Sequence, residues 1–185
     1  MRWEDLFADL ERQWEALGES DRQAEVAERT RAEFARVRLV DRLRGSEARE
    51  VGLVTRGGQE LTGELSRVGP DFVLVSTGRH ECVVPVDAIR SVRGLGTATV
   101  SAEAVGPVQA RLGLASVLRT IAADRSVVTV VTTDDRAVSG TLQRVGSDFV
   151  ELLEHPVDET ARAAQGRGLT LMPFVVVALV RRESP

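Results

Sequence analysis

A short stretch of this chain, VGPDFV at residues 68–73, recurs with one substitution as VGSDFV at residues 145–150. The residues before it recur as well, because residues 50–73 align with residues 127–150 without a gap. Both segments alternate apolar and polar side chains on either side of a short turn, a pattern typical of strands and hairpins. The repeat therefore predicts a tandem duplication of one small β module, which strongly limits how a chain of 185 residues can fold.

Each copy is expected to hold about five short strands in a few tens of residues, a density typical of small β-barrels. The second copy contains a longer loop near residues 154–168, which we expect at the surface. It is also preceded by a helix-like segment, GPVQARLGLASVLRTIAA, at residues 106–123. The duplicated unit is thus interpreted as a helix followed by a barrel.

The N-terminal residues predict a helical hairpin. Its first helix carries a narrow apolar seam with spacings of four and three. The seam consists of Trp3, Phe7, Leu10, Trp14 and Leu17. The stretch LGES then suits a helix end and a new start, and a second helix is expected from about residue 21 to residue 44. Because burying large apolar side chains contributes much more than surface ion pairs, the seam is a candidate protein contact. Its partner is the second helix or a barrel face of the same chain, or else another protein or a second copy.

The predicted fold class is α+β, with a helical hairpin at 1–45, a first five-stranded barrel at 46–100, and a helix plus second barrel at 101–185. A lone barrel of this size buries only about 60% of its surface, so we expect the two barrels to be fused. The segment 174–180 is apolar at every position, which predicts a strand buried on both faces. The candidate contact residues there are Phe174, Val176 and Leu179.

The segment GQELTGELSRVGPDFVLV followed by VDAIRSV resembles the Sm-like family, and bacterial Hfq in particular. The resemblance rests on a glycine in the second strand (Gly63 and Gly140), on an aromatic residue leading the third (Phe72 and Phe149), and on the last-strand pattern AI-S-V. It implies RNA binding and ring assembly through pairing of barrel edges. SH3-like and PRC-type barrels share such patterns, and the sequence does not separate their strand orders.

The RNA-binding positions of that family carry over poorly. Where Hfq has a Lys and His pair, the two copies have Val86–Asp87 and Phe174–Val175, and the chain contains no Asn. Arginines and acids nearly balance along the chain, whereas a nucleic-acid footprint needs roughly 6 to 10 basic contacts on one face. An RNA-binding Sm-like regulator is therefore the alternative function, with a basic rim formed by Arg38, Arg42 and Arg44.

Few residues could carry enzyme or metal chemistry. His80 and Cys82 share one face of a predicted strand, but the second copy has Gly168 and Thr170 at those places. His155 lies in the inserted loop, and this spacing of His and Cys is not that of a metal site. A phosphate-binding loop is also missing from the sequence. We therefore expect no enzyme activity, no cofactor and no small-molecule substrate.

Composition narrows the setting in which the protein acts. The single Cys cannot form an internal disulfide, and the acidic, polar N-terminus does not match a signal peptide. The longest apolar run is about half a bilayer span. The sequence thus predicts a cytoplasmic, non-enzymatic protein-interaction or assembly module that acts by pairing edge strands with a protein partner or with a second copy.

Overall fold

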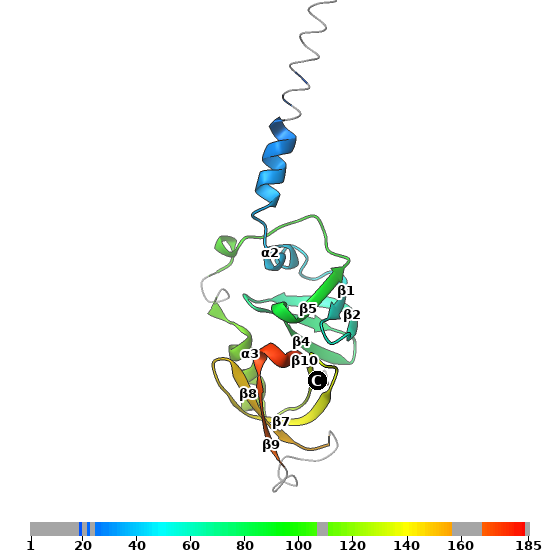
Figure 1. The fold of residues 1–185 in the computed structure, drawn as a ribbon, viewed down its shortest axis with the longest axis vertical. Helices are drawn as coiled ribbons and strands as arrows, with labels where there is room; N and C mark the ends of the chain where they lie inside the picture. The colour runs from blue at the N-terminus through cyan, green and yellow to red at the C-terminus, as the bar shows by residue number, and fades with distance from the viewer. Residues whose placement is uncertain (1–18, 20–21, 23–24, 107–110, 157–167, 184–185) are drawn as a thin grey trace, which may run out of the picture. The chain divides into compact units, whose positions relative to one another are not determined.

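The computed structural model describes most of the chain, namely residues 19, 22, 25–106, 111–156 and 168–183 (Figure 1). The chain divides into two compact units, one ending at Arg38 and one beginning at Leu39. Each unit is described separately below. The first helix of the expected hairpin, with its seam from Trp3 to Leu17, lies outside the described residues.

The expected second helix does not reach residue 44. Residues 25–34 are helical and are followed by a turn. At the end of this helix the N–H of Arg36 donates to the carbonyl oxygen of Glu33 at 3.1 Å. This bond spans three residues, as in a 3₁₀ turn, whereas the bonds of an α-helix span four. The next helix, α2 (Leu39–Arg44), is a separate element of the second unit. It is separate because Val40 and Leu43 are buried in the core of that unit.

The second unit contains one antiparallel sheet of ten strands in the order β5-β1-β2-β3-β4-β10-β6-β7-β8-β9. The strands are β1 (Glu50–Thr55), β2 (Glu60–Val68), β3 (Phe72–Ser76), β4 (His80–Pro85), β5 (Ile89–Arg93), β6 (Val127–Thr132), β7 (Ala137–Val145), β8 (Phe149–Glu154), β9 (Leu169–Pro173) and β10 (Val177–Glu183). Helix α3 (Leu114–Asp124) precedes β6, and the short 3₁₀ turns are η1 (Val86–Ala88), η2 (Ala102–Ala104) and η4 (Phe174–Val176).

The prediction of two closed five-stranded barrels with an N-terminal helical hairpin is wrong. The sheet is continuous and open, and its outer strands β5 and β9 each have one neighbour. The physical reason is the pairing of β4 with β10, which runs from Val83 opposite Val180 to His80 opposite Glu183. The facing edges of the two halves are joined to each other by this ladder, so neither half closes on itself (Figure 1).

The sequence repeat corresponds to a repeat in the sheet. The order β5-β1-β2-β3-β4 in the first half is matched by β10-β6-β7-β8-β9 in the second. The register agrees too, because Leu65 lies opposite Val75 as Leu142 lies opposite Leu152, and each pair is followed by an irregularity. The two copies therefore share a strand order and a register within one sheet.

Each half of the sheet contributes apolar side chains to the core of the other half across the junction. Phe72 and Val83 of the first half join the second core, together with Leu118 of α3. In return, Val131 and Leu179 of the second half join the first core. Residues 177–180 of β10 are all buried, as predicted for this part of the apolar run. The prediction of one buried strand over 174–180 is wrong for its first residues, because 174–176 form η4 and Val175 is 80% exposed.

Gly63 and Gly140 occupy equivalent positions in β2 and β7, where no side chain fits. A Cβ atom at Gly63 would collide with the carbonyl oxygen of Ser76, and one at Gly140 would collide with that of Leu153. Because the obstacle in both copies is backbone of the neighbouring strand, it cannot move aside without disturbing the ladder. These glycines allow β2 and β7 to approach their neighbours closely.

Replacing Gly63 by Ala should therefore lower the free energy of unfolding by about 1–3 kcal/mol, the usual cost of overpacking. The matched control is Gly52→Ala in β1, where the nearest atom to a new Cβ is 3.9 Å away. That variant should be neutral or more stable by up to about 1 kcal/mol, since Ala loses less backbone entropy than Gly. Urea unfolding of both variants measures the difference, and equal stabilities would contradict the close approach.

Candidate functional site

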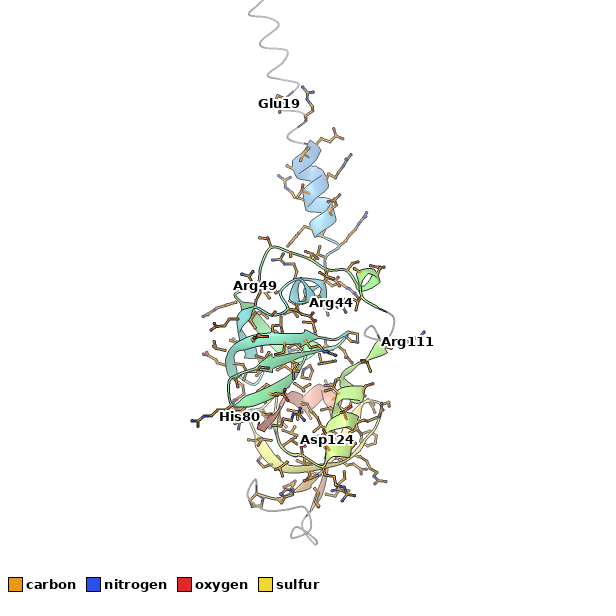
Figure 2. All side chains as sticks on the ribbon, turned by 180° about the vertical axis from the view of Figure 1, so that it is seen from behind. Glu19, Arg44, Arg49, His80, Arg111 and Asp124 are labelled. Carbon is orange, nitrogen blue, oxygen red and sulfur yellow. The ribbon has the colours of Figure 1, made fainter. Side chains whose placement is uncertain are left out.

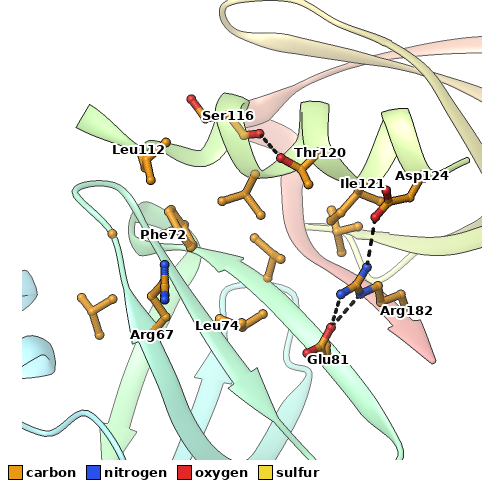
Figure 3. A pocket seen from close by; sticks show the side chains of 15 residues that line it. Arg67, Phe72, Leu74, Glu81, Leu112, Ser116, Thr120, Ile121, Asp124 and Arg182 are labelled. Carbon is orange, nitrogen blue, oxygen red and sulfur yellow. Dashed lines mark hydrogen bonds and ion pairs between the residues drawn. The ribbon is translucent and has the colours of Figure 1, made fainter. Parts of the chain in front are cut away.

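The junction between β4 and β10 is reinforced by a charged cluster. Arg182 of β10 contacts the Glu81 carboxylate twice, with its Nε donating at 2.7 Å and its Nη2 lying 2.6 Å away. Its Nη1 lies 3.9 Å from the carboxylate of Asp124, at the end of α3 (Figure 3). Both contacts are made to the same oxygen, Oε2, and hydrogen bonds between ionised groups are stronger than those between neutral ones. One arginine thus links two strands and a helix.

The repeated VGPDFV turn also connects the two halves. The carboxylate of Asp71 in this turn accepts a hydrogen bond of 2.8 Å from the backbone N–H of Leu114. Leu114 begins α3, whose own N-cap residue, Gly113, has no side chain to cap the helix. An aspartate at this place satisfies one of the unpaired N–H groups of the first turn. The first copy therefore caps the helix that belongs to the second.

Strand β9 is an open and apolar edge. It pairs only with β8, and Leu169 and Leu171 keep 52% and 55% of their surfaces exposed. The repeat-equivalent of Leu171 in β4 is Val83, which is 2% exposed because it packs in the core formed with β10 and α3. An exposed edge strand presents unpaired backbone groups as well as side chains. The edge that β10 covers on β4 in the first half is thus left open on β9 in the second half, as far as the described residues show.

Strand β5 forms the opposite edge of the sheet and, among the strands that the structure describes, pairs only with β1. It is the repeat-equivalent of β10, the strand that pairs with β4 inside the chain. Its exposed side chains include Arg90 and Arg93, while Ile89 and Val92 are half-buried. Charged residues on an edge strand limit unspecific pairing. The open edges β5 and β9 are therefore the repeat-equivalents of β10 and β4, the two strands of the internal junction.

A pocket of about 300 Å³ lies beside the junction, between α3 and strands β2, β3, β4 and β10. Its floor is apolar and includes Phe72, Leu74 and Ile121 (Figure 3). The charged side chains Arg67, Glu81, Asp124 and Arg182 stand at its rim. The pocket was not predicted from the sequence, because its walls come from segments that are distant along the chain.

The candidate contact residues of the C-terminal segment are divided between surface and core. Phe174 and Val176 are half-buried and pack against the core of the second half. Leu179 is 2% exposed and belongs to the core of the first half. Leu179 therefore contacts the other half of its own chain, whereas Val175 between the first two is highly exposed.

Two arginines of the predicted RNA rim form bonds within the fold. Arg44 is buried, and its Nη1 donates to the Asp41 carboxylate at 2.9 Å (Figure 2). Arg42 donates to the backbone carbonyls of Thr97 at 2.5 Å and Gly96 at 2.6 Å. These bonds fasten α2 to the segment after β5. Arg38 is the last residue of the first unit.

The histidines and the cysteine do not come together as a reactive group. His155 is buried, with Nε2 2.8 Å from the Thr141 hydroxyl and Nδ1 2.8 Å from the carbonyl oxygen of Pro156. Cys82 is buried in β4, and this burial raises the pKa of its thiol, although nearby Arg181 opposes the shift. In the described part of the chain, no group of three or more His, Cys, Asp or Glu residues could hold a metal ion.

No protein-family model matches the chain, and no curated protein sequence matches it either. The Sm-like resemblance accordingly stays a prediction from the sequence. A search of the described residues for membrane-spanning helices finds none that combines the necessary length with the necessary apolar character.

The burial of Cys82 predicts a strong protection of its thiol. An aromatic disulfide reagent should react with the native protein slower than with the urea-unfolded protein by on the order of 10³, because reaction requires opening of the sheet. Rapid labelling of the native protein would contradict this burial.

The same thiol predicts a loss of stability at high pH. The folded pKa is raised above the ordinary value of 9.0, so the unfolded state ionises first as the pH rises. Its contribution to stability is therefore complete below about pH 9 and declines above it. Cys82→Ala should remove this part of the alkaline decline in urea titrations, and an unchanged decline would contradict the assignment to Cys82.

Proposed function

We propose that the protein is a non-enzymatic interaction module that assembles with copies of itself through the open edges of its sheet. In the proposed contact, β5 of one copy pairs with the outer side of β9 of another. One observation carries the proposal: β10 pairs with β4 inside the chain, and β5 and β9 are their repeat-equivalents. The chain therefore contains a second, unused set of the strands that form its own junction.

The internal register specifies the proposed contact. Val180 lies opposite Val83 and Arg181 lies opposite Cys82. Transfer of this register through the repeat sets Val92 of one copy opposite Leu171 of the other. Full burial of a leucine contributes roughly 1.5–3 kcal/mol, so covering the exposed half of Leu171 adds to the new backbone bonds.

The symmetry of the contact determines the kind of assembly. Two different strands meet, so each added copy still leaves one β5 edge and one β9 edge unpaired. Such heterologous contacts close into a ring when the rotation between copies permits it, and otherwise extend into a filament. A two-fold dimer, in which the same edge meets itself, is not the expected product.

Two further observations favour a contact function over catalysis. Cys82 and His155 are buried, and His155 uses both ring nitrogens within the fold. A single buried thiol also suits a reducing compartment, so the proposal includes a cytoplasmic location.

The substitution Leu171→Arg tests the proposed edge. The wild-type protein should show a mass that rises with concentration in sedimentation or light-scattering measurements. The variant should weaken association by about tenfold or more, because a charge in a β ladder must be desolvated when the ladder forms. Val26→Arg is the matched control, since it makes the same change at an exposed apolar side chain of the helix at residues 25–34 and should leave association unchanged.

A wild-type protein that stays monomeric at high concentration would overturn the proposal, as would equal association of Leu171→Arg and the wild type. Titration with a single-stranded oligouridine over a salt series belongs to the same experiment. The proposal expects no binding, whereas micromolar affinity with a steep salt dependence would favour the RNA-binding alternative.

A further inference from the structure

The pocket beneath α3 has the features of a small-molecule site. Its volume of about 300 Å³ lies at the lower end of the range of about 300–1,000 Å³ that ligand pockets cover. Apolar side chains from both halves of the sheet and from α3 form its floor, among them Leu74, Val117 and Val180. A ligand that fills this space must be small and must carry an apolar part.

The charges at the rim of the pocket are distributed unevenly. Arg182 is neutralised by Glu81 and Asp124, which lie close to it at one end of the pocket (Figure 3). The Arg67 side chain lies beside Phe72, away from that cluster, and its guanidinium forms no hydrogen bond or ion pair with any other described residue (Figure 3). The described rim therefore places the positive charge of Arg67 apart from a cluster of two carboxylates and one guanidinium, with the apolar floor between them.

The second copy of the repeat serves as an internal comparison. Arg144 occupies the position equivalent to Arg67, and Glu151 occupies the position equivalent to Leu74. Arg144 binds Glu151 with two bonds, from Nε at 2.6 Å and from Nη2 at 3.1 Å. The second copy thus supplies its own carboxylate to the arginine. The first copy has an apolar side chain in place of that carboxylate, and its arginine has no partner.

We infer that this pocket binds a small organic acid with a short apolar chain, and that Arg67 holds the carboxylate of this ligand. The apolar chain lies along Leu74 and Val83, where Glu151 and Leu171 stand in the second copy. A ligand with carboxylates at both ends fits less well, because its second charge would approach Glu81 and Asp124. This inference does not depend on the proposed assembly.

Octanoate is the probe, and neutral octanol and the dicarboxylate suberate are its comparisons. Isothermal titration should give saturable binding of octanoate, with weaker binding of both comparisons. Arg67→Met should reduce the affinity for octanoate about tenfold or more, since a charge-assisted bond is lost, and should leave the affinity for octanol unchanged. Arg67 is exposed at the pocket mouth, so this substitution does not disturb the core.

Two further variants refine the test. Arg144→Met makes the same change in the second copy and should not alter octanoate binding. Leu74→Glu introduces the second copy's ion pair into the first and should abolish binding, with thermal unfolding measured to verify its fold. If Leu74→Glu fails to fold, Arg67→Met alone decides. Absence of saturable octanoate binding, equal binding of octanol, or an unchanged affinity in Arg67→Met would each overturn the inference.

Discussion

The pairing of β4 with β10 is the interaction on which the rest of the structure depends. It converts two repeats into one sheet, and it brings side chains of each half into the core of the other. A single half would bury only about 60% of its surface and would be marginal alone. Phe72 and Leu179 show the consequence, because each completes the core of the half to which it does not belong. Folding of either half is thus tied to formation of this ladder.

Duplication has left the two copies alike in backbone and different in surroundings. Val83 and Leu171 hold equivalent positions, yet the first is buried at the junction with β10 and the second is exposed. Leu74 and Glu151 are also equivalent, yet Leu74 lines a pocket whereas Glu151 binds Arg144. After a duplication, one copy can keep a given contact while the equivalent residues of the other copy change and form a different contact. Both proposals above rest on such differences between equivalent residues.

The sequence was informative where a pattern is local. Alternation and turn residues predicted the strands, and the apolar run predicted the double burial of β10, because both signals depend on neighbours along the chain. Barrel closure was predicted wrongly, since which edge pairs with which is decided between segments far apart, such as β4 and β10. The helix expected to reach residue 44 was also wrong, because burial of Val40 and Leu43 fixes α2 separately. The sequence does contain one signal for the pocket, because Leu74 in the first copy stands where the second copy has Glu151.

The pocket at the internal junction has a repeat-equivalent in the proposed contact between copies, but the two places carry different side chains. A ligand in the pocket touches β3, β4 and β10 together, so it binds only the joined sheet and stabilises the internal junction by mass action. In the proposed contact between copies, α2 takes the place of α3, and the Arg144–Glu151 pair takes the place of Arg67 and Leu74. In that pair the guanidinium of Arg144 is already bound by Glu151, so at the contact between copies this arginine is not free to bind the carboxylate of a ligand. The ligand would therefore strengthen the junction within a chain and leave the contact between chains unaffected.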